Sequence, residues 1–172
     1  MRKLAVGVAI AIAAGIFLLH AAGPFFEPLC PADATPVTAE FLAGDGLIKT
    51  SAGTLDKKGE SFVTAGKSGA LSYGPWSRLR PGSYAVAWYG NVQSESRPTF
   101  DVYSHGAILA SGSPDLAPSS NSTELFSQRF RLDAPTDALE FRVMVGEHDN
   151  VALHAIRLTT FSCERNAREP AA

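Results

Sequence analysis

Aromatic side chains on predicted strands and turns are the groups of this sequence best suited to binding. A flat ring can stack on the apolar face of a sugar while nearby polar groups bind its hydroxyls. Tyr89 and Tyr103 lie on the faces of their strands opposite the apolar stripe, and Tyr73 and Trp76 flank a Gly-Pro turn. All four are stacking candidates; the alternative for each is a half-buried strand residue or, for Trp76, the core edge.

Arg129 and Arg142 supply a candidate anion site. They fall on the polar faces of two successive predicted strands. If those strands form a hairpin with Phe130 opposite Phe141, Arg129 lies directly opposite Arg142. Like charges in that position destabilise a sheet, so the pair would favour a bound anion such as a uronate or phosphate. The alternative is a solvated charged face.

Patterns for catalysis or metal binding are weak. No Gly-x-Ser-x-Gly elbow occurs, and His105, His148 and His154 are too scattered for a recognised zinc-ligand set. No carboxylate pair stands out for glycoside hydrolysis. We therefore expect a protein that is not an enzyme and that binds neither a cofactor nor a metal. A small hydrolase of the cell envelope is kept as the third functional hypothesis, after the two given at the end of this section.

The two cysteines, Cys30 and Cys163, lie at the two ends of the domain that is expected to follow the apolar N-terminal segment. Two cysteines cannot form a zinc site alone, and their spacing is not a redox motif. In an oxidising compartment a structural disulfide is expected. A reactive thiol would need an activating His or Lys beside it, and the sequence shows none.

The N-terminal segment predicts delivery to a membrane. Arg2 and Lys3 precede an apolar run, and residues 4–26 as a helix would span about 34 Å, enough to cross a ~30 Å hydrocarbon core. The best small-x-small cleavage site is followed by Pro24, which fits a protease badly. We expect a retained signal-anchor helix at residues 1–26 with the later chain outside; a cleaved signal and a secreted or periplasmic domain are the alternative.

The composition of the outer part limits its partners. About 145 residues remain, which suggests one domain with a single core. Without Arg2 and Lys3 the chain holds 13 basic and 17 acidic side chains, a net charge of −4. This balance argues against a nucleic-acid binder and against electrostatic docking to anionic lipid.

Short strands separated by turns account for the rest of the chain. Period-two alternation is clearest at residues 83–89, 99–103, 125–132 and 139–145, and a last strand runs from 151 to about 160. Weaker strands are expected at 40–42, 47–50, 61–65, 70–73, 76–79 and 107–110. Trp88 shares the core face of its strand with Tyr84 and Val86. The other side chains expected to be buried are Phe100, Val102, Phe126, Phe130, Phe141 and Val143.

Two longer polar loops interrupt the strands, at residues 90–98 and 111–123. Loops of this length in a compact domain are binding loops or mobile loops. The second loop contains a glycosylation sequon at Asn121.

The segment Tyr73-Gly74-Pro75-Trp76-Ser77-Arg78-Leu79-Arg80-Pro81-Gly82-Ser83-Tyr84 resembles the aromatic-x-x-x-Leu-x-Pro-Gly-x-Tyr strand-turn-strand of galactose-binding-like jelly rolls. Residues 139–143 and 151–158 resemble the last two strands of that fold. The resemblance covers about residues 37–160 and implies a non-catalytic carbohydrate-binding module. Family members with a calcium site often carry Asp in the closing strand. His154 stands there in this chain, and this departure argues against carrying a calcium site over.

The expected fold class is all-β: a β-sandwich or jelly roll at residues 37–163. An N-terminal hydrophobic helix (1–26) and a linker (27–36) precede it, and a disordered tail (164–172) follows. We interpret the chain as a membrane-tethered, non-catalytic domain that binds cell-envelope carbohydrate. The alternative is an accessory subunit that docks on a membrane enzyme or transporter.

Overall fold

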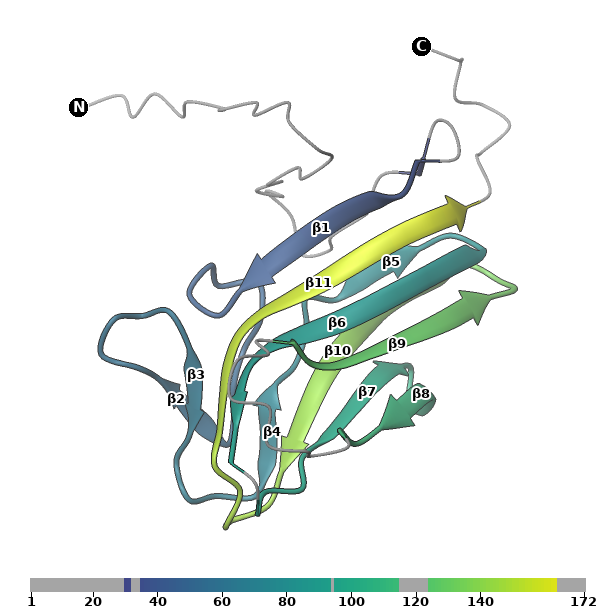
Figure 1. Ribbon diagram of the computed structural model, residues 1–172. Coiled ribbons are helices and arrows are strands. Elements are labelled where there is room, and N and C mark those ends of the chain that lie inside the picture. Colours follow the sequence, from purple (N-terminus) through teal and green to yellow (C-terminus); the bar gives the residue numbers. More distant parts are fainter. Residues whose placement is uncertain (1–29, 32–34, 94, 115–123, 164–172) are drawn as a thin grey trace, which may run out of the picture.

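A computed structural model describes residues 30–31, 35–93, 95–114 and 124–163, and within these ranges the chain forms eleven β-strands and no helix (Figure 1). The predicted leader (1–26), most of the linker, the Asn121 sequon and the predicted tail (164–172) lie outside the described residues. The described part holds no helix that is long and apolar enough to span a membrane. The strands are β1 (Val37–Leu42), β2 (Gly53–Leu55), β3 (Phe62–Thr64), β4 (Gly69–Ser72), β5 (Ser77–Leu79), β6 (Gly82–Val92), β7 (Thr99–Ser104), β8 (Ala107–Gly112), β9 (Glu124–Leu132), β10 (Thr136–Val145) and β11 (Val151–Cys163).

The strands form two antiparallel sheets. The six-stranded sheet has the order β2-β3-β11-β6-β9, and β1 also pairs with β11. The five-stranded sheet has the order β4-β10-β7-β8, and β5 also pairs with β10. In each sheet one long strand pairs with two short strands, one after the other along the same edge. The long strand β11 pairs with β3 and β1, and the long strand β10 pairs with β4 and β5. The predicted all-β class is confirmed for the described residues; the jelly-roll family stays a prediction.

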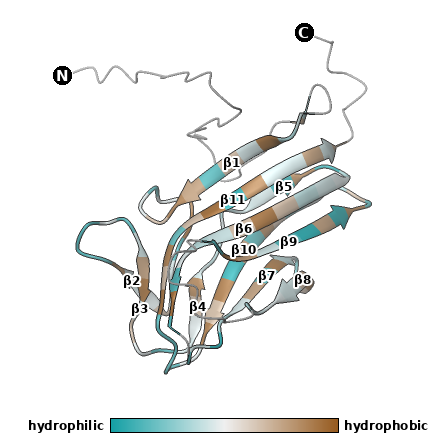
Figure 2. Cartoon of the chain, viewed as in Figure 1, coloured by the Kyte–Doolittle hydropathy of each residue, from teal (hydrophilic) through white to brown (hydrophobic). Residues whose placement is uncertain are grey.

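The core lies between the two sheets. Phe41 of β1 packs against Phe141 of β10 at 6.3 Å between ring centroids, and Trp88 of β6 packs against Phe100 of β7 at 5.4 Å. Figure 2 shows the matching bands of hydrophobic residues on β6, β10 and β11. The predicted core residues Trp88, Phe100, Val102, Phe141 and Val143 are all fully buried.

Phe126 and Phe130 are only half-buried, which corrects the expectation that they fill the core. Both belong to β9, which is an edge strand of the six-stranded sheet. Their rings pack against Trp88 and Tyr84 at 6.0 and 5.4 Å from one side. An edge strand has a neighbour on one side only, and its inward side chains therefore keep some exposure.

The hairpin between residues 125–132 and 139–145, on which the candidate anion site depends, does not form. β9 pairs with β6, and β10 pairs with β7, so two strands that follow one another in the chain lie in different sheets. Arg129 consequently lies opposite Ala85, and Arg142 lies opposite Asp101. Residues 133–135, which connect β9 to β10, include Asp133 and Pro135; such turn residues fit a crossing between layers as well as a hairpin, and local pattern does not distinguish the two.

Smaller departures concern strand limits. Residues 53–55 form a strand that was not predicted, because three residues are too few to show an alternating pattern. Residues 47–50 were predicted as a strand but form only one isolated bridge, between Lys49 and Tyr73. β11 continues beyond residue 160 to Cys163, three residues past the expected end. This extension places Phe161 on the sheet.

The predicted disulfide is confirmed. Cys30 and Cys163 are bonded, and their Cα atoms lie 5.6 Å apart. The bond ties the segment before β1 to the end of β11, the longest strand of the molecule. Both ends of the domain therefore meet at one end of the six-stranded sheet.

Candidate functional site

β6 presents small side chains on the outer face of the six-stranded sheet. Side chains of a strand alternate between its two faces. The core residues of β6 are fully buried, and Ser83, Ala85, Ala87 and Tyr89 between them keep intermediate exposure on the other face. Three small residues thus precede one large ring along a distance of about 20 Å at ~3.3 Å per residue.

The strands on either side of β6 carry larger polar side chains. Ala85 lies between Thr159 of β11 and Arg129 of β9, and Ala87 lies between Arg157 and Ser127 in the same way. Directly opposite residues share a face of an antiparallel sheet. We call this surface the β6 strip; its members are Ser83, Ala85, Ala87 and Tyr89 on β6, Arg157, Thr159 and Phe161 on β11, and Ser127, Arg129 and Arg131 on β9.

Tyr89 closes one end of the β6 strip within a set of charge-assisted contacts. Its hydroxyl donates to Glu124 Oε2 at 3.2 Å and accepts from Arg157 Nη1 at 3.3 Å. The Arg157 guanidinium also lies 4.7 Å from the centroid of the ring and donates to Glu40 Oε1 at 2.7 Å. These contacts fix the ring, and a fixed ring loses little further freedom when a ligand stacks on it.

Two pKa values at this end follow from the same contacts. The hydrogen bond to Glu40 raises the pKa of Arg157, with Tyr89 adding to the effect and burial opposing it. Burial raises the pKa of the Tyr89 hydroxyl, and the Arg157 charge lowers it in part. Arg157 is therefore a permanent cation with its charge balanced locally, and Tyr89 is a neutral donor and acceptor at physiological pH.

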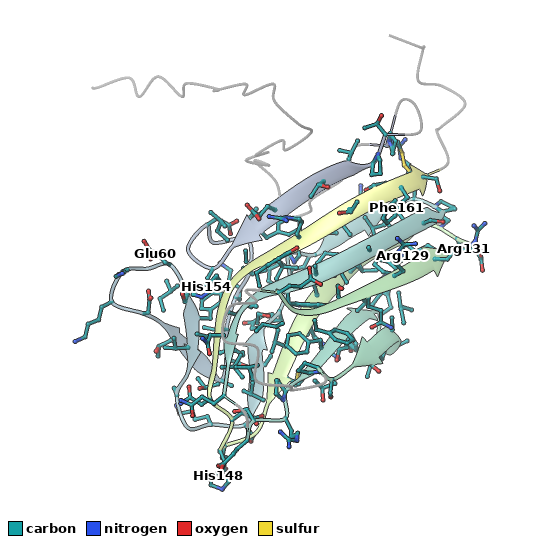
Figure 3. The ribbon with its side chains drawn as sticks, in the orientation of Figure 1. Glu60, Arg129, Arg131, His148, His154 and Phe161 are labelled. Carbon is teal, nitrogen blue, oxygen red and sulfur yellow. A yellow bond between two sulfur atoms is a disulfide. The ribbon has the colours of Figure 1, made fainter. Side chains whose placement is uncertain are left out.

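Phe161 and Arg129 form the second aromatic contact, toward the other end of the β6 strip (Figure 3). The Arg129 guanidinium lies 5.1 Å from the centroid of the Phe161 ring. Arg129 is exposed and Phe161 is half-exposed. A guanidinium stacked on a ring keeps its N–H donors directed outward in its own plane, where they can reach a ligand.

A cavity of about 260 Å³ lies next to this end. Its walls come from Pro81 and Gly82, from Arg131, Leu132 and Asp133, and from Ser162 and Cys163. Glycine is required at its base, because a Cβ on Gly82 would lie 2.1 Å from the Ser162 carbonyl oxygen. Arg131 and Asp133 pair at 3.1 Å across the exposed rim.

The remaining arginine candidate, Arg142, lies on the other sheet and is fully engaged. Its Nε and Nη2 donate to the two oxygens of Asp101 at 2.8 and 2.9 Å, and its guanidinium stacks 3.7 Å from the centroid of the Tyr103 ring. Asp101 is 2% exposed. The hydrogen bonds to Asp101 raise the pKa of Arg142, against the effect of burial. The expected anion site between Arg129 and Arg142 does not form, because the two residues lie on different sheets.

Tyr73 and Trp76 lie beside β10 of the same five-stranded sheet. Their rings meet edge to face at 5.9 Å, and both are half-buried. The Phe141 amide donates to the Gly74 carbonyl at 2.7 Å, which anchors the turn between the two rings to β10. Burial raises the pKa of the neighbouring Glu140 carboxyl, while the Arg142 charge and the Gly74 amide lower it in part.

The structure therefore divides the predicted binding residues between two surfaces. Tyr89 and Arg129 share the β6 strip, and Tyr73, Trp76, Tyr103 and Arg142 belong to the five-stranded sheet. Sequence reasoning missed Phe161 and Arg157. The sequence pattern could have identified both, because residues 157, 159 and 161 continue the alternation that places every second side chain of the last strand on the outer face. Phe161 was not considered because the strand was predicted to end near residue 160.

One serine–histidine contact bears on the hydrolase alternative. Ser61 Oγ and His154 Nδ1 are hydrogen-bonded at 2.5 Å, with His154 on β11 beside β3 (Figure 3). Ser61 is only 3% exposed, so a substrate does not reach its oxygen. In the described ranges no acidic side chain forms a hydrogen bond or ion pair with His154, and no three His, Cys, Asp or Glu side chains are grouped to hold a metal ion.

No protein-family profile and no curated protein matches the chain. Solved structures that match this chain weakly include a family two carbohydrate esterase from Cellvibrio japonicus, with a TM-score of 0.43 and 12% identity over 78% of this chain and 38% of that chain. This chain thus spans little more than a third of the esterase. A cyclase from Fischerella sp. TAU has a TM-score of 0.40 and 13% identity over 80% of this chain and 82% of that chain. Similarity at this level identifies neither a family nor an activity.

Proposed function

We propose that this protein is a non-catalytic domain that binds cell-envelope carbohydrate along the β6 strip while its N-terminal segment tethers it to the outer face of the cytoplasmic membrane. The observation that carries the proposal is a row of small side chains, Ser83, Ala85 and Ala87, along β6. Larger, mostly polar side chains of β11 and β9 flank this row, and Tyr89 and Phe161 supply aromatic rings on the same surface. Sugar recognition combines flat apolar contact with fixed polar groups, and the strip offers both.

The arrangement of the strip suits an oligosaccharide better than a single sugar. The small side chains, from Ser83 to Ala87, keep the strip low over about 13 Å, and hydroxyls stand on its walls at Thr159 and Ser127. Thr38 of β1 adds a further hydroxyl, hydrogen-bonded to Thr159 at 3.2 Å. Sheets position side chains more rigidly than loops do, so the side chains of the strip lose little conformational entropy when a ligand binds.

A glycan array tests this proposal, with the full-length protein in detergent as the probe. We expect binding to one class of envelope oligosaccharide and its loss in Phe161→Ala and Tyr89→Ala, each checked for folding by circular dichroism. A matched control is Tyr73→Ala, which removes a half-buried ring from the other sheet. Folded variants that bind as the wild type does would remove the strip from the proposal.

A second candidate function is an accessory subunit that docks on a membrane enzyme or transporter. Ile108 and Leu109 on β8 favour it, since they are 57% and 44% exposed on a strand that ends its sheet. Apolar side chains on an open edge favour pairing with another chain. Co-purification from detergent tests this function: Ile108→Lys should release the partner, whereas a partner retained by that variant would argue against β8 as the contact.

A further inference from the structure

The two ends of the β6 strip differ in electrostatic balance. At the Tyr89 end, Arg157 is paired with Glu40 at 2.7 Å, and Glu124 accepts from the Tyr89 hydroxyl. At the Phe161 end, Arg129 and Arg131 are both exposed. Among the described residues no carboxylate pairs with Arg129, and Asp133 pairs with Arg131 through exposed side chains, 72% and 88%. Exposed pairs of that kind are weak and exchange readily with a competing anion.

From this asymmetry we propose that the Phe161 end is an anion subsite formed by Arg129 and Arg131, and that the preferred ligand is a glycan carrying an oxyanion, a uronate or a sugar phosphate. The inference rests on the proposed function and specifies its ligand class. Arg129 and Arg131 stand two positions apart on one face of β9, about 6.7 Å along the strand. Two arginine side chains that start at that spacing on one face are long enough to bring both guanidinium groups to one oxyanion.

Phe161 gives the subsite its orientation. The Arg129 guanidinium lies over the ring, 5.1 Å from its centroid, and this contact limits the directions in which its N–H donors can point. The cavity of about 260 Å³ bounded by Arg131 and Ser162 adjoins this pair and offers room for the charged substituent of a sugar. Arg142 is excluded from such a role, because its Nε and Nη2 already donate to the buried Asp101 carboxylate and its guanidinium stacks on Tyr103.

The test compares matched ligands on the full-length protein in detergent by isothermal titration calorimetry. The probes are a galacturonic acid tetrasaccharide, the same tetrasaccharide with its carboxylates reduced to alcohols, and the reduced form carrying one phosphate ester. We expect at least one charged probe to bind about tenfold tighter than the neutral probe at low salt, the scale of one or two exposed charge-assisted bonds. The preference should shrink on raising NaCl from about 0.05 to about 0.5 M.

Variants assign the preference to the subsite. Arg129→Gln should lower the affinity for the charged probe to near that of the neutral probe, and Arg131→Gln should have a smaller effect. Lys67→Gln is the matched control, because it removes one exposed positive charge in the loop after β3 without touching the strip. Thermal melts confirm that each variant is folded.

The outcomes separate the two proposals. Equal binding of charged and neutral probes overturns the anion subsite and leaves the carbohydrate function standing. An anion preference that survives in folded Arg129→Gln and Arg131→Gln also overturns the subsite. Binding of none of the probes, together with an empty glycan array, overturns both.

Discussion

Arg129, Arg142 and Arg157 each lie near an aromatic ring, but their roles differ. Arg142 is nearly enclosed and satisfies a buried carboxylate, Arg157 bridges Glu40 and the Tyr89 hydroxyl, and Arg129 stacks on Phe161 in the open. The same residue type therefore acts as a structural cation, as a positioning group and as an available donor. Burial and the nearest carboxylate decide among these roles.

Tyr89→Ala should weaken glycan binding by about 1–3 kcal/mol, or roughly 5- to 150-fold, the range for removing one well-packed aromatic contact. Tyr89→Phe should retain most of the affinity, because it keeps the ring and removes only the hydroxyl that bonds Glu124 and Arg157. Titration of both variants with the glycan identified on the array measures the difference. Equal losses in the two variants would mean that the ring does not stack on the ligand.

Arg142→Leu should destabilise the domain by about 3 kcal/mol, because it leaves the Asp101 carboxylate buried without its partner. We place the loss at the low end of the range for buried pairs, since the Arg142 side chain keeps 18% exposure. Arg131→Leu is the matched control and should cost less than about 1 kcal/mol, because its pair with Asp133 is exposed. Urea denaturation measures both, and similar losses would contradict the assigned roles.

At the scale of elements, the sequence predicts strands well and their pairing poorly. Alternation at residues 83–89 correctly places Trp88 in the core and Tyr89 on the outer face. Pairing depends on contacts between segments far apart in the chain: β6 lies between β11 and β9, and no local pattern reports this. The anion site between Arg129 and Arg142 required β9 to pair with β10; in the structure β9 pairs with β6, and Arg129 lies over Phe161.

The disulfide belongs to the same scale, because it joins the segment before β1 to the end of β11. Reduction, or replacement of Cys30 and Cys163 by Ser, should lower the free energy of unfolding by up to about 5 kcal/mol, given the separation of 133 residues. For a domain of this size the melting temperature should fall by about 10–20 °C. Melts with and without reductant measure the shift; an unchanged melting temperature would show that strand pairing alone holds the two ends.

Glu140 on β10 predicts a pH effect with a definite sign. Burial raises the pKa of its carboxyl in the folded protein above the usual 4.5. The folded state therefore holds the proton more tightly, and this contribution to stability is present at low pH and is lost as the pH rises through the raised pKa. Glu140→Gln stays neutral, so its stability relative to the wild type should increase between about pH 4 and pH 7.

Melting temperatures at the two pH values check this prediction. Glu147→Gln, in the exposed turn after β10, is the control and should follow the wild type at both. A Glu140→Gln variant that loses stability relative to the wild type as the pH rises would show that the Arg142 charge and the Gly74 amide outweigh burial.

At the scale of the whole molecule, two layers separate the structural and binding roles of similar residues. In the five-stranded sheet Arg142, stacked on Tyr103, neutralises Asp101, whereas the six-stranded sheet leaves Arg129 exposed beside Phe161. The disulfide stands at the same end of the six-stranded sheet as the cavity beside Arg131. The proposed anion subsite therefore lies at the end of the domain where Cys30 is bonded to Cys163.

The leader supplies the last prediction. We expect residues 1–26 to stay attached, because Pro24 directly follows Ala21-Ala22-Gly23 and its fixed φ and missing N–H fit badly into an extended protease substrate. Protein extracted from membranes should have the intact mass of the full chain, 18.2 kDa. Pro24→Ala is the matched variant: it keeps the apolar run, removes the obstacle and should give a shortened, released domain. A wild-type mass that begins between Ala21 and Phe26 would contradict the anchor, and the carbohydrate-binding domain would then act as a released protein.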